Sequence, residues 1–157
     1  MLWWGKRTSM TRFRLVPSTH LVLFREGKVL LLRRFQTGWY DGDYSVIAGH
    51  LDGNETVRKA MIREAKEEAG IEINEEDLVI VHVMHRKEEQ KDKDLVERVD
   101  FFVTTATWSG EIQNKEPSKC DDISWFPVDK LPENMVPYVR SGIQSILKKE
   151  LYSEFGW

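Results

Sequence analysis

The chain has 157 residues, and its 23 Lys and Arg against 26 Asp and Glu give a formal net charge of −3 and a pI of about 5.9. That length fits one domain with a substantial core, and a hydrophobic content of 41% excludes a chain that is disordered throughout. The slight acidic excess argues against general nucleic-acid binding, which usually needs a basic excess, but it is compatible with a nucleotide held by a metal.

Cysteine content and the start of the chain bear on where the protein works. The single cysteine, Cys120, excludes a disulfide scaffold and suits the reducing cytoplasm. Apolar runs such as residues 29–32 are far too short to cross a membrane. At the start, Lys6 and Arg7 follow the apolar residues, which is unlike a signal peptide. We therefore expect residues 1–9 to be a disordered leader before a single domain over residues 10–157.

The first strongly patterned segment predicts a β-hairpin. Strands are expected over residues 19–25 and 28–34, because both are rich in aliphatic residues, and Glu26-Gly27 between them suits a tight turn. A loop rich in Gly and Asp is expected over residues 36–43, followed by a short strand over residues 44–47.

A second glycine-containing loop, residues 49–54, leads into the clearest helix of the chain, residues 55–69. Asn54 is the expected N-cap, and Gly70 is the expected stop. Apolar residues recur at four-residue spacing and predict one buried stripe, made of Val57, Met61, Ala65 and Ala69.

The second half of the chain predicts three strands and a helix. The strands are expected over residues 78–84, 99–106 and 123–126, and the helix over residues 137–152. Residues 86–98 hold five basic and five acidic side chains, which is typical of a solvated hairpin loop. Hairpin strands with two separated helices predict the α+β class, with a mixed β-sheet against which the helices pack.

Three carboxylates on the first helix are the strongest chemical signal. Glu64, Glu67 and Glu68 stand at i, i+3 and i+4, so their side chains share one face and repel one another. A hard divalent cation with oxygen ligands relieves such repulsion, and Mg²⁺ combines a few carboxylates with waters and substrate phosphates. Gly49 lets the backbone approach such an ion, so its carbonyl is a further candidate ligand. The alternative is a solvated acidic helix face.

Arg63 and Glu55 are eight residues apart, about two helical turns. They can pair if the chain before the helix folds back. The arginine would then hold the glycine loop against the helix, which is a structural role rather than a chemical one.

Residues 49–71, GHLDGNETVRKAMIREAKEEAGI, carry a specific resemblance. Their spacing resembles the box of the Nudix hydrolases, a family of MutT-like nucleotide pyrophosphohydrolases. One departure is Ile47-Ala48-Gly49, where many members have Pro-Gly-Gly. The residues that match the box are Gly49, Glu55, Arg63, Glu64, Glu67, Glu68, Gly70 and Ile71.

The resemblance implies a fold, a reaction and a cofactor. The fold would be the Nudix α/β/α sandwich, with a mixed sheet between helices. The reaction would be hydrolysis of a nucleoside diphosphate linked to another group X, with Mg²⁺ as the cofactor and Mn²⁺ as a substitute. Catalysis of this kind needs neutralised phosphate oxygens, a positioned water and a base for its proton.

The resemblance also assigns roles to single residues. Glu67 and Glu68 match metal-binding positions, and Gly49 matches the position that lends its carbonyl. Glu64 matches a metal ligand or general base, so the catalytic set is Glu64, Glu67 and Glu68. Glu55 and Arg63 match the structural pair. A further acidic ligand often comes from a later loop, for which the candidates are Glu116 and, less favoured, Asp121 or Asp122.

Substrate-binding candidates lie outside the box. Arg34 can meet a phosphate, although a plain surface arginine is as well supported. Trp39 and Tyr40 lie in the loop after the hairpin and offer faces on which a nucleobase can stack. His50 can touch a phosphate or make a local hydrogen bond. Trp125 and Phe126 are expected to fill the core instead.

The first hypothesis is a hydrolase that converts a nucleoside triphosphate, unmodified or oxidised, to the monophosphate and pyrophosphate. ADP-ribose, dinucleoside polyphosphates and sugar nucleotides are alternative substrates. A nucleotide sensor without turnover, a Ca²⁺-binding structural protein and an isomerase-like catalytic Cys120 are weaker hypotheses. The expected partner is a small-molecule nucleotide, with no nucleic acid and no membrane, and a homodimer is left open.

Overall fold

The computed structural model describes residues 12–89 and 96–157, so the leader expected over residues 1–9 lies outside the described residues. None of the described helices is long and apolar enough to cross a membrane. In chain order the elements are β1 (Val16–Leu21), β2 (Phe24–Arg25), β3 (Lys28–Arg34), β4 (Tyr44–Ser45), β5 (Ile47–His50), α1 (Val57–Ala69), a 3₁₀ turn (Glu75–Asp77), β6 (Val79–Glu88), β7 (Val96–Thr104), β8 (Cys120–Pro127), α2 (Pro137–Leu147) and β9 (Tyr152–Phe155).

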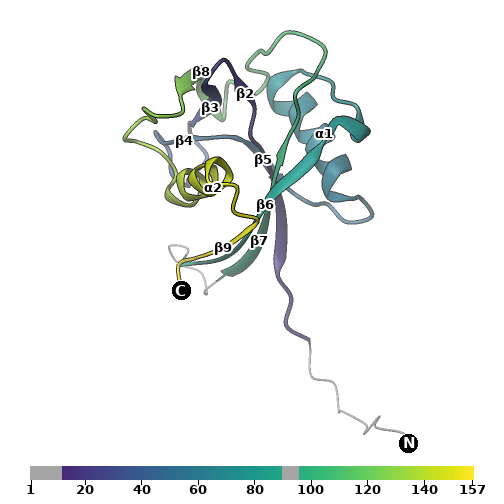
Figure 1. Ribbon diagram of the computed structural model, residues 1–157, viewed down its shortest axis with the longest axis vertical. Coiled ribbons are helices and arrows are strands. Elements are labelled where there is room, and N and C mark those ends of the chain that lie inside the picture. Colours follow the sequence, from purple (N-terminus) through teal and green to yellow (C-terminus); the bar gives the residue numbers. More distant parts are fainter. Residues whose placement is uncertain (1–11, 90–95) are drawn as a thin grey trace, which may run out of the picture.

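The strands form two sheets, and the helices cover opposite sides of the larger one (Figure 1). In the larger sheet the strand order is β5-β1-β7-β6-β9; β1 runs parallel to β7 and β9 parallel to β6, while the other pairs are antiparallel. In the smaller sheet β3 pairs antiparallel with β2, β4 and β8. Helix α1 packs on β5 and β1, and α2 packs on β6 and β9. The predicted α+β class, with a mixed sheet between helices, is confirmed.

Alternation along β3 divides its side chains between two cores. Leu30 and Leu32 face a core that includes Met61 of α1. Val29 and Leu31 face the core that contains the α2 side chains. Successive residues of a strand point to opposite faces, so one apolar strand can supply both layers.

The predicted hairpin is present, but its first strand is shorter than expected. Glu26 and Gly27 have φ of 50° and 70°, which suits a type I′ turn between β2 and β3. The chain changes sheets within the predicted strand 19–25, because Val22 N bonds Val103 O whereas Leu30 N bonds Leu23 O. The predicted strand 44–47 divides in the same way, and β5 extends through Gly49 and His50, which were expected in a loop.

Helix α1 begins two residues later than predicted. Its N-cap is Thr56, whose side chain accepts from Lys59 N, whereas Asn54 has φ of 53° and lies in the preceding loop. Glu55 therefore stands outside the helix, where its side chain is free to turn back. Gly70, with φ of 70°, ends the helix as predicted.

Two predictions for the second half are wrong. Residues 86–88 and 96–98 belong to β6 and β7 and not to a solvated loop; residues 90–95 of that segment lie outside the described residues. Strand pairing buries Arg86, which is only 3% exposed, and leaves the other charged side chains there partly buried. Helix α2 ends at Leu147, and residues 152–155 form β9 because their backbone pairs with β6. The left-handed backbone of Lys149, with φ of 60°, marks the break.

Candidate active site

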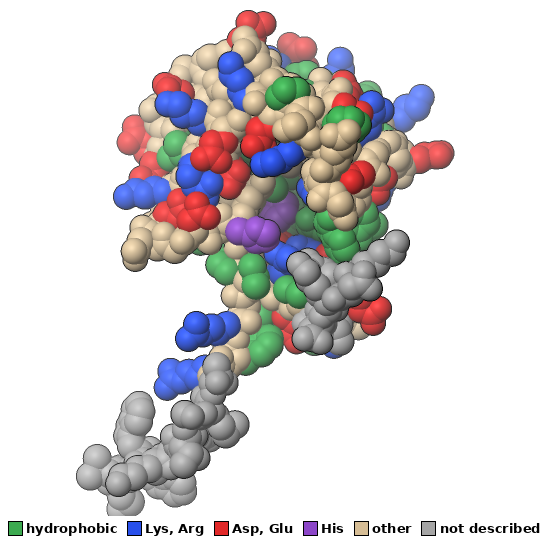
Figure 2. Space-filling model, turned by 180° about the vertical axis from the view of Figure 1, so that it is seen from behind, with side chains coloured by type: hydrophobic (Ala, Val, Ile, Leu, Met, Phe, Trp, Pro, Cys, Tyr) green, Lys and Arg blue, Asp and Glu red, His purple; other side chains and the backbone are tan. Residues whose placement is uncertain are grey.

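A cavity of about 580 Å³ opens between α1, β5 and the loop before β8. On the face seen in Figure 2, acidic and basic side chains gather around a hollow in which histidine side chains are visible. The cavity is lined by five of the predicted metal-site residues: Gly49, Glu64, Glu67, Glu68 and Glu116.

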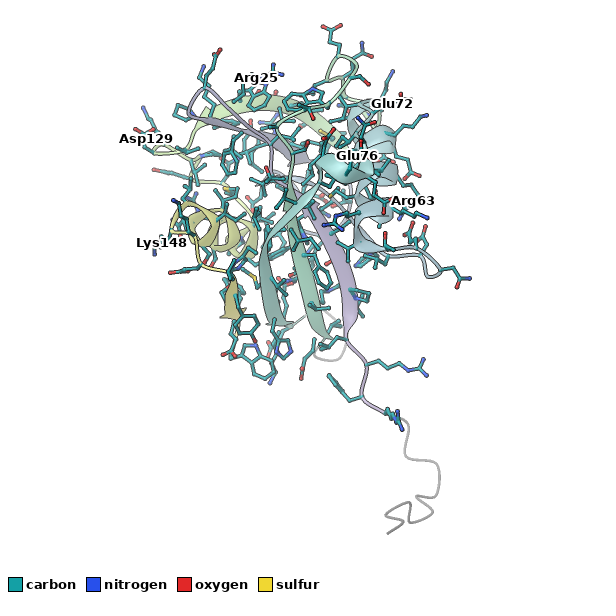
Figure 3. All side chains as sticks on the ribbon, turned by 45° about the vertical axis from the view of Figure 1, so that its right-hand side comes forward. Arg25, Arg63, Glu72, Glu76, Asp129 and Lys148 are labelled. Carbon is teal, nitrogen blue, oxygen red and sulfur yellow. The ribbon has the colours of Figure 1, made fainter. Side chains whose placement is uncertain are left out.

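Arg63, which projects from α1 (Figure 3), ties the loop before the helix to the helix itself. Its guanidinium contacts both carboxylate oxygens of Glu55, with Nη2–Oε1 2.8 Å and Nε–Oε2 3.2 Å, and it also donates to His50 O at 3.1 Å. The hydrogen bond from Arg63, together with the one from Asp52 N, lowers the pKa of Glu55. The structure thus brings together the pair that the sequence analysis assigned to a fixing role.

The carboxylate of Glu68 is difficult to ionise in the metal-free site. Its Oε2 accepts a hydrogen bond from Ala48 N at 3.1 Å. Burial nevertheless raises the pKa of Glu68 to about 8, and the negative charges of Glu64 and Glu116 add to the rise. Burial also raises the pKa of Glu64, although Arg63 opposes that shift with an Nη1–Oε1 contact of 2.7 Å. Burial and neighbouring charge therefore both oppose ionisation of Glu68 when no cation is bound.

Gly49 lies directly against the carboxylate of Glu64. A Cβ atom at position 49 would overlap the Glu64 side chain, including its carboxylate carbon. Glycine is required here by close approach rather than by an unusual backbone angle. The backbone of β5 thereby reaches the carboxylate face of α1.

Glu116 is the acidic residue that the tertiary structure adds to the helix cluster. Its Oε1 accepts from Lys119 Nζ at 3.0 Å, and it lines the cavity. Asp121 instead pairs with Arg33 at 2.7 Å, and Asp122 accepts from the Tyr44 hydroxyl at 2.6 Å. The structure therefore brings Glu116 to the site and engages both aspartates elsewhere.

The donor set fits a divalent cation. No three of the described His, Cys, Asp and Glu side chains form a preformed metal cage. Arg63 pairs with Glu64 and lies 3.5 Å from Glu67. Mg²⁺ does not need such a cage, because it keeps several waters and takes only one or two carboxylates. The site therefore offers several carboxylate oxygens, which are hard donors of the kind that Mg²⁺ binds.

Of the four predicted substrate-binding residues, Arg34 and His50 line this cavity, whereas Trp39 and Tyr40 do not. Arg34 lines the cavity, but its guanidinium also braces the loop that follows by donating to Trp39 O at 2.6 Å and to Thr37 Oγ1 at 3.0 Å. His50 lines the cavity beside Arg98, and burial and that positive charge lower the pKa of His50. Tyr40 donates to Glu88 at 2.8 Å and packs against the α2-side core.

A second cavity of about 250 Å³ adjoins the first, because Arg34, Ala48, Gly49 and His50 line both. Trp39 lines only this second cavity of the two. Sequence reasoning missed most of its residues, since they come from β1, β6, β7 and α2. The one available signal was polar residues within an apolar strand. The missed residues are Ser18, His20, Arg86, Glu88, Arg98 and Tyr138.

A buried ionic network forms one wall of the second cavity. Arg86 Nε donates to Asp100 Oδ2 at 2.6 Å, and Arg86 also pairs with Glu88. The Ser18 hydroxyl donates to Asp100, which is fully buried. The guanidinium of Arg86 lies 3.7 Å above the Tyr138 ring. Burial lowers the pKa of the neighbouring His20 to about 4, so that imidazole is neutral at pH 7.

Comparisons with known proteins agree with this geometry. The family model described as NUDIX domain matches residues 14–146. NAD-capped RNA hydrolases NudC from two Pseudomonas aeruginosa strains are 28% identical to the chain over 119 residues, which cover 76% of this chain and 38% of each relative. The chain thus spans little more than a third of the length of those curated relatives.

Solved structures share the fold at low identity. A MutT NUDIX hydrolase from Burkholderia pseudomallei has a TM-score of 0.74 and 23% identity, with 84% of this chain and 98% of that chain covered. An ADP-ribose pyrophosphatase from Streptococcus suis has a TM-score of 0.57 and 21% identity, with coverage of 90% and 98%. These neighbours support the α/β/α arrangement, and of these two names only the second states a substrate, ADP-ribose.

Proposed function

The chain belongs to the Nudix family, and from that premise we propose that it is a metal-dependent hydrolase of a nucleoside diphosphate linked to a group X. In this proposal the preferred substrate is a nucleoside triphosphate, unmodified or oxidised, which is converted to the monophosphate and pyrophosphate. The observation that carries the proposal is the convergence of Glu116, from a distant loop, on the three glutamates of α1.

The proposed metal is Mg²⁺, with Mn²⁺ as a substitute. The residues that would hold it are the Gly49 carbonyl, Glu64, Glu67, Glu68 and Glu116. When bound, the ion supplies positive charge to phosphate oxygens and makes a coordinated water more acidic. The observation that supports this set is that all five residues line one cavity.

The chain's own residues orient the reactants. Arg63 fixes the loop through Glu55 and holds Glu64 in place, while Gly49 leaves room for that carboxylate. Water attacks the α- or β-phosphorus, a new P–O bond forms, and the bond from that phosphorus to the α,β-bridging oxygen breaks, which releases the monophosphate and pyrophosphate. We assign to Glu64 the acceptance of the proton from that water. We assign to Arg34, which lines both cavities, a contact with a substrate phosphate.

The test is turnover of a substrate panel with Mg²⁺ by the wild type, Glu68→Gln and the control Glu72→Gln. The panel holds unmodified and oxidised nucleoside triphosphates, ADP-ribose, NAD, diadenosine polyphosphates and sugar nucleotides. We expect one triphosphate to be best, with Glu68→Gln reduced by about 100-fold or more because a metal ligand is lost. Glu72 pairs with Lys66 on the surface, so turnover by Glu72→Gln should match that of the wild type.

Each other outcome changes the proposal in a defined way. Preference for ADP-ribose or a dinucleotide would keep the reaction and replace the substrate. Tight nucleotide binding without turnover of any compound would favour a sensor. Equal turnover by Glu68→Gln and the wild type would remove the metal assignment.

A further inference from the structure

One buried nitrogen in the second cavity lacks a partner. His20 lies in the middle of β1 and is only 2% exposed, yet its Nδ1 has no hydrogen bond to any part of the chain that the structure describes. Buried polar atoms in native proteins are nearly always hydrogen-bonded. Because the His20 side chain lines the cavity, a bound molecule is the natural source of the missing partner.

The imidazole is held in a fixed orientation. It stacks on Phe102, with ring centroids 4.9 Å apart and an interplanar angle of 23°. It also makes an edge-to-face contact with the Tyr138 ring, whose centroid lies 5.8 Å from that of His20. On the backbone, β1 is paired on both sides, so His20 registers with Ala48 of β5 and with Phe102 of β7. A ring fixed in this way can recognise a hydrogen-bonding group with little loss of conformational entropy.

The buried ionic network beside the imidazole is internally paired. Arg86 is neutralised by Asp100 and Glu88, and the Ser18 hydroxyl is engaged with Asp100. This network therefore favours a neutral polar group beside His20, and the positive charge available to an anion in the cavity is that of Arg34 and Arg98. A neutral imidazole has one N–H donor and one acceptor nitrogen, and Nδ1 in either form can make a single hydrogen bond with a polar group on the edge of a nucleobase.

An aromatic surface in the same cavity fits a heterocycle. Trp39 is half-buried and lines the second cavity, and aromatic faces are the surfaces on which bases stack. Gly49 and His50 line both cavities, so a ligand with its ring in the second cavity can reach the carboxylates of the first with its phosphates.

We infer that His20 is a specificity-determining residue, whose imidazole hydrogen-bonds the polar edge of the substrate's nucleobase. This inference rests on the proposed function. It goes further by assigning the base to the second cavity and its discrimination to β1.

The experiment compares kcat/KM for the preferred nucleoside triphosphate with kcat/KM for the base-free ribose 5-triphosphate. His20→Phe keeps an aromatic ring against Phe102 and removes both nitrogens. We expect the ratio of the two kcat/KM values to fall by about tenfold or more, the effect of losing a hydrogen bond to a buried group. Partial recovery of the ratio in His20→Asn or His20→Gln is expected, because an amide can donate and accept.

His82→Phe is the matched control. His82 is 1% exposed and also packs on Phe102, at 5.5 Å, but its ring nitrogens contact Glu150 O and Ser153 Oγ, and it does not line the second cavity. We expect His82→Phe to lower stability without changing the ratio. An equal fall of the ratio in both variants would overturn the inference, because it would show a general packing effect.

A measurement on the wild type covers the case in which the variants do not fold. With ¹⁵N-labelled histidine, the ring-nitrogen signals of His20 should shift on addition of the corresponding nucleoside monophosphate and not on addition of ribose 5-phosphate. Unchanged His20 signals with saturating monophosphate would overturn the inference. If no nucleotide is hydrolysed, the proposed function fails; if nucleotides are hydrolysed and His20→Phe keeps the wild-type ratio, only the role of His20 fails.

Discussion

At the scale of single residues, Gly49 leaves no room for a larger side chain beside Glu64. A side chain there would displace the carboxylate of Glu64, to which the proposal assigns the proton transfer. We expect Gly49→Ala to lower kcat/KM by about tenfold or more while the protein still folds, because a misplaced catalytic group is costly. Steady-state kinetics beside far-UV circular dichroism measure this. Ala48→Gly keeps the backbone N–H that Glu68 needs and should stay near wild type; equal losses in both variants would contradict the argument.

The charge of Glu68, which the proposed metal site needs, should lower the stability of the metal-free protein. Its pKa of about 8 in the folded protein lies above the unfolded value of 4.5, so its charge destabilises the metal-free protein as the pH rises between these values. Glu68→Gln should therefore be more stable than the metal-free wild type at pH 8, by roughly 1–3 kcal/mol. Urea unfolding measures the difference. Mg²⁺ should stabilise the wild type more than the variant, and a variant that is less stable without metal would contradict the account.

At the scale of elements, the contact between the loop and α1 depends on one side chain. Arg63 joins Glu55, His50 O and Glu64, so Arg63→Ala removes several hydrogen bonds at once. We expect a loss of about 1–3 kcal/mol in the free energy of unfolding together with a lower kcat. Lysine should not restore either property, because it lacks the planar fork that contacts both oxygens of Glu55.

Urea unfolding and turnover of the same preparations test this. Arg58→Ala is the control, since Arg58 is an α1 arginine whose Nε donates to Leu78 O, away from the first cavity. A wild-type free energy of unfolding in Arg63→Ala would show that Arg63 does not fix the loop.

At the scale of the whole molecule, stability should respond to acid through a buried histidine. The unfolded chain protonates His20 below its ordinary pKa of 6.5, whereas the folded chain resists protonation until about 4. The unfolded state thus binds more protons in this window, and stability falls as the pH drops from 6.5 to 4, by roughly 2–3 kcal/mol. Desolvation is the main cause; Asp100 opposes it, while Arg86, His50 and Arg98 add to it.

Urea unfolding of the wild type and His20→Phe at pH 7.5, 6 and 5 isolates this effect from Glu68, which has the opposite slope. The wild type should lose stability relative to His20→Phe as the pH falls. Parallel profiles would mean that His20 is protonated equally in the folded and unfolded chains.

Local patterns were enough to predict some elements and not others. Strand β3 and the end of α1 at Gly70 follow from short-range signals, and both are confirmed. The start of α1 was misplaced because Thr56 and Asn54 are both good caps, and only the loop conformation selects between them. The helix predicted over residues 137–152 was too long and ran into Tyr152, the first residue of β9, because the strand conformation there comes from pairing with β6, about 70 residues earlier in the chain.

The sequence by itself determined the carboxylate face of α1, because helical spacing places Glu64, Glu67 and Glu68 together whatever the rest of the chain does. The contact of Arg63 with Glu55 also needed the loop before α1 to fold back, because Glu55 lies outside the helix. Only the tertiary structure decided that Glu116, and neither Asp121 nor Asp122, joins that face. It alone assembled the second cavity around His20, from β1, β6, β7 and α2. The physical reason is that these contacts depend on long-range strand pairing and on burial, which a local pattern does not encode.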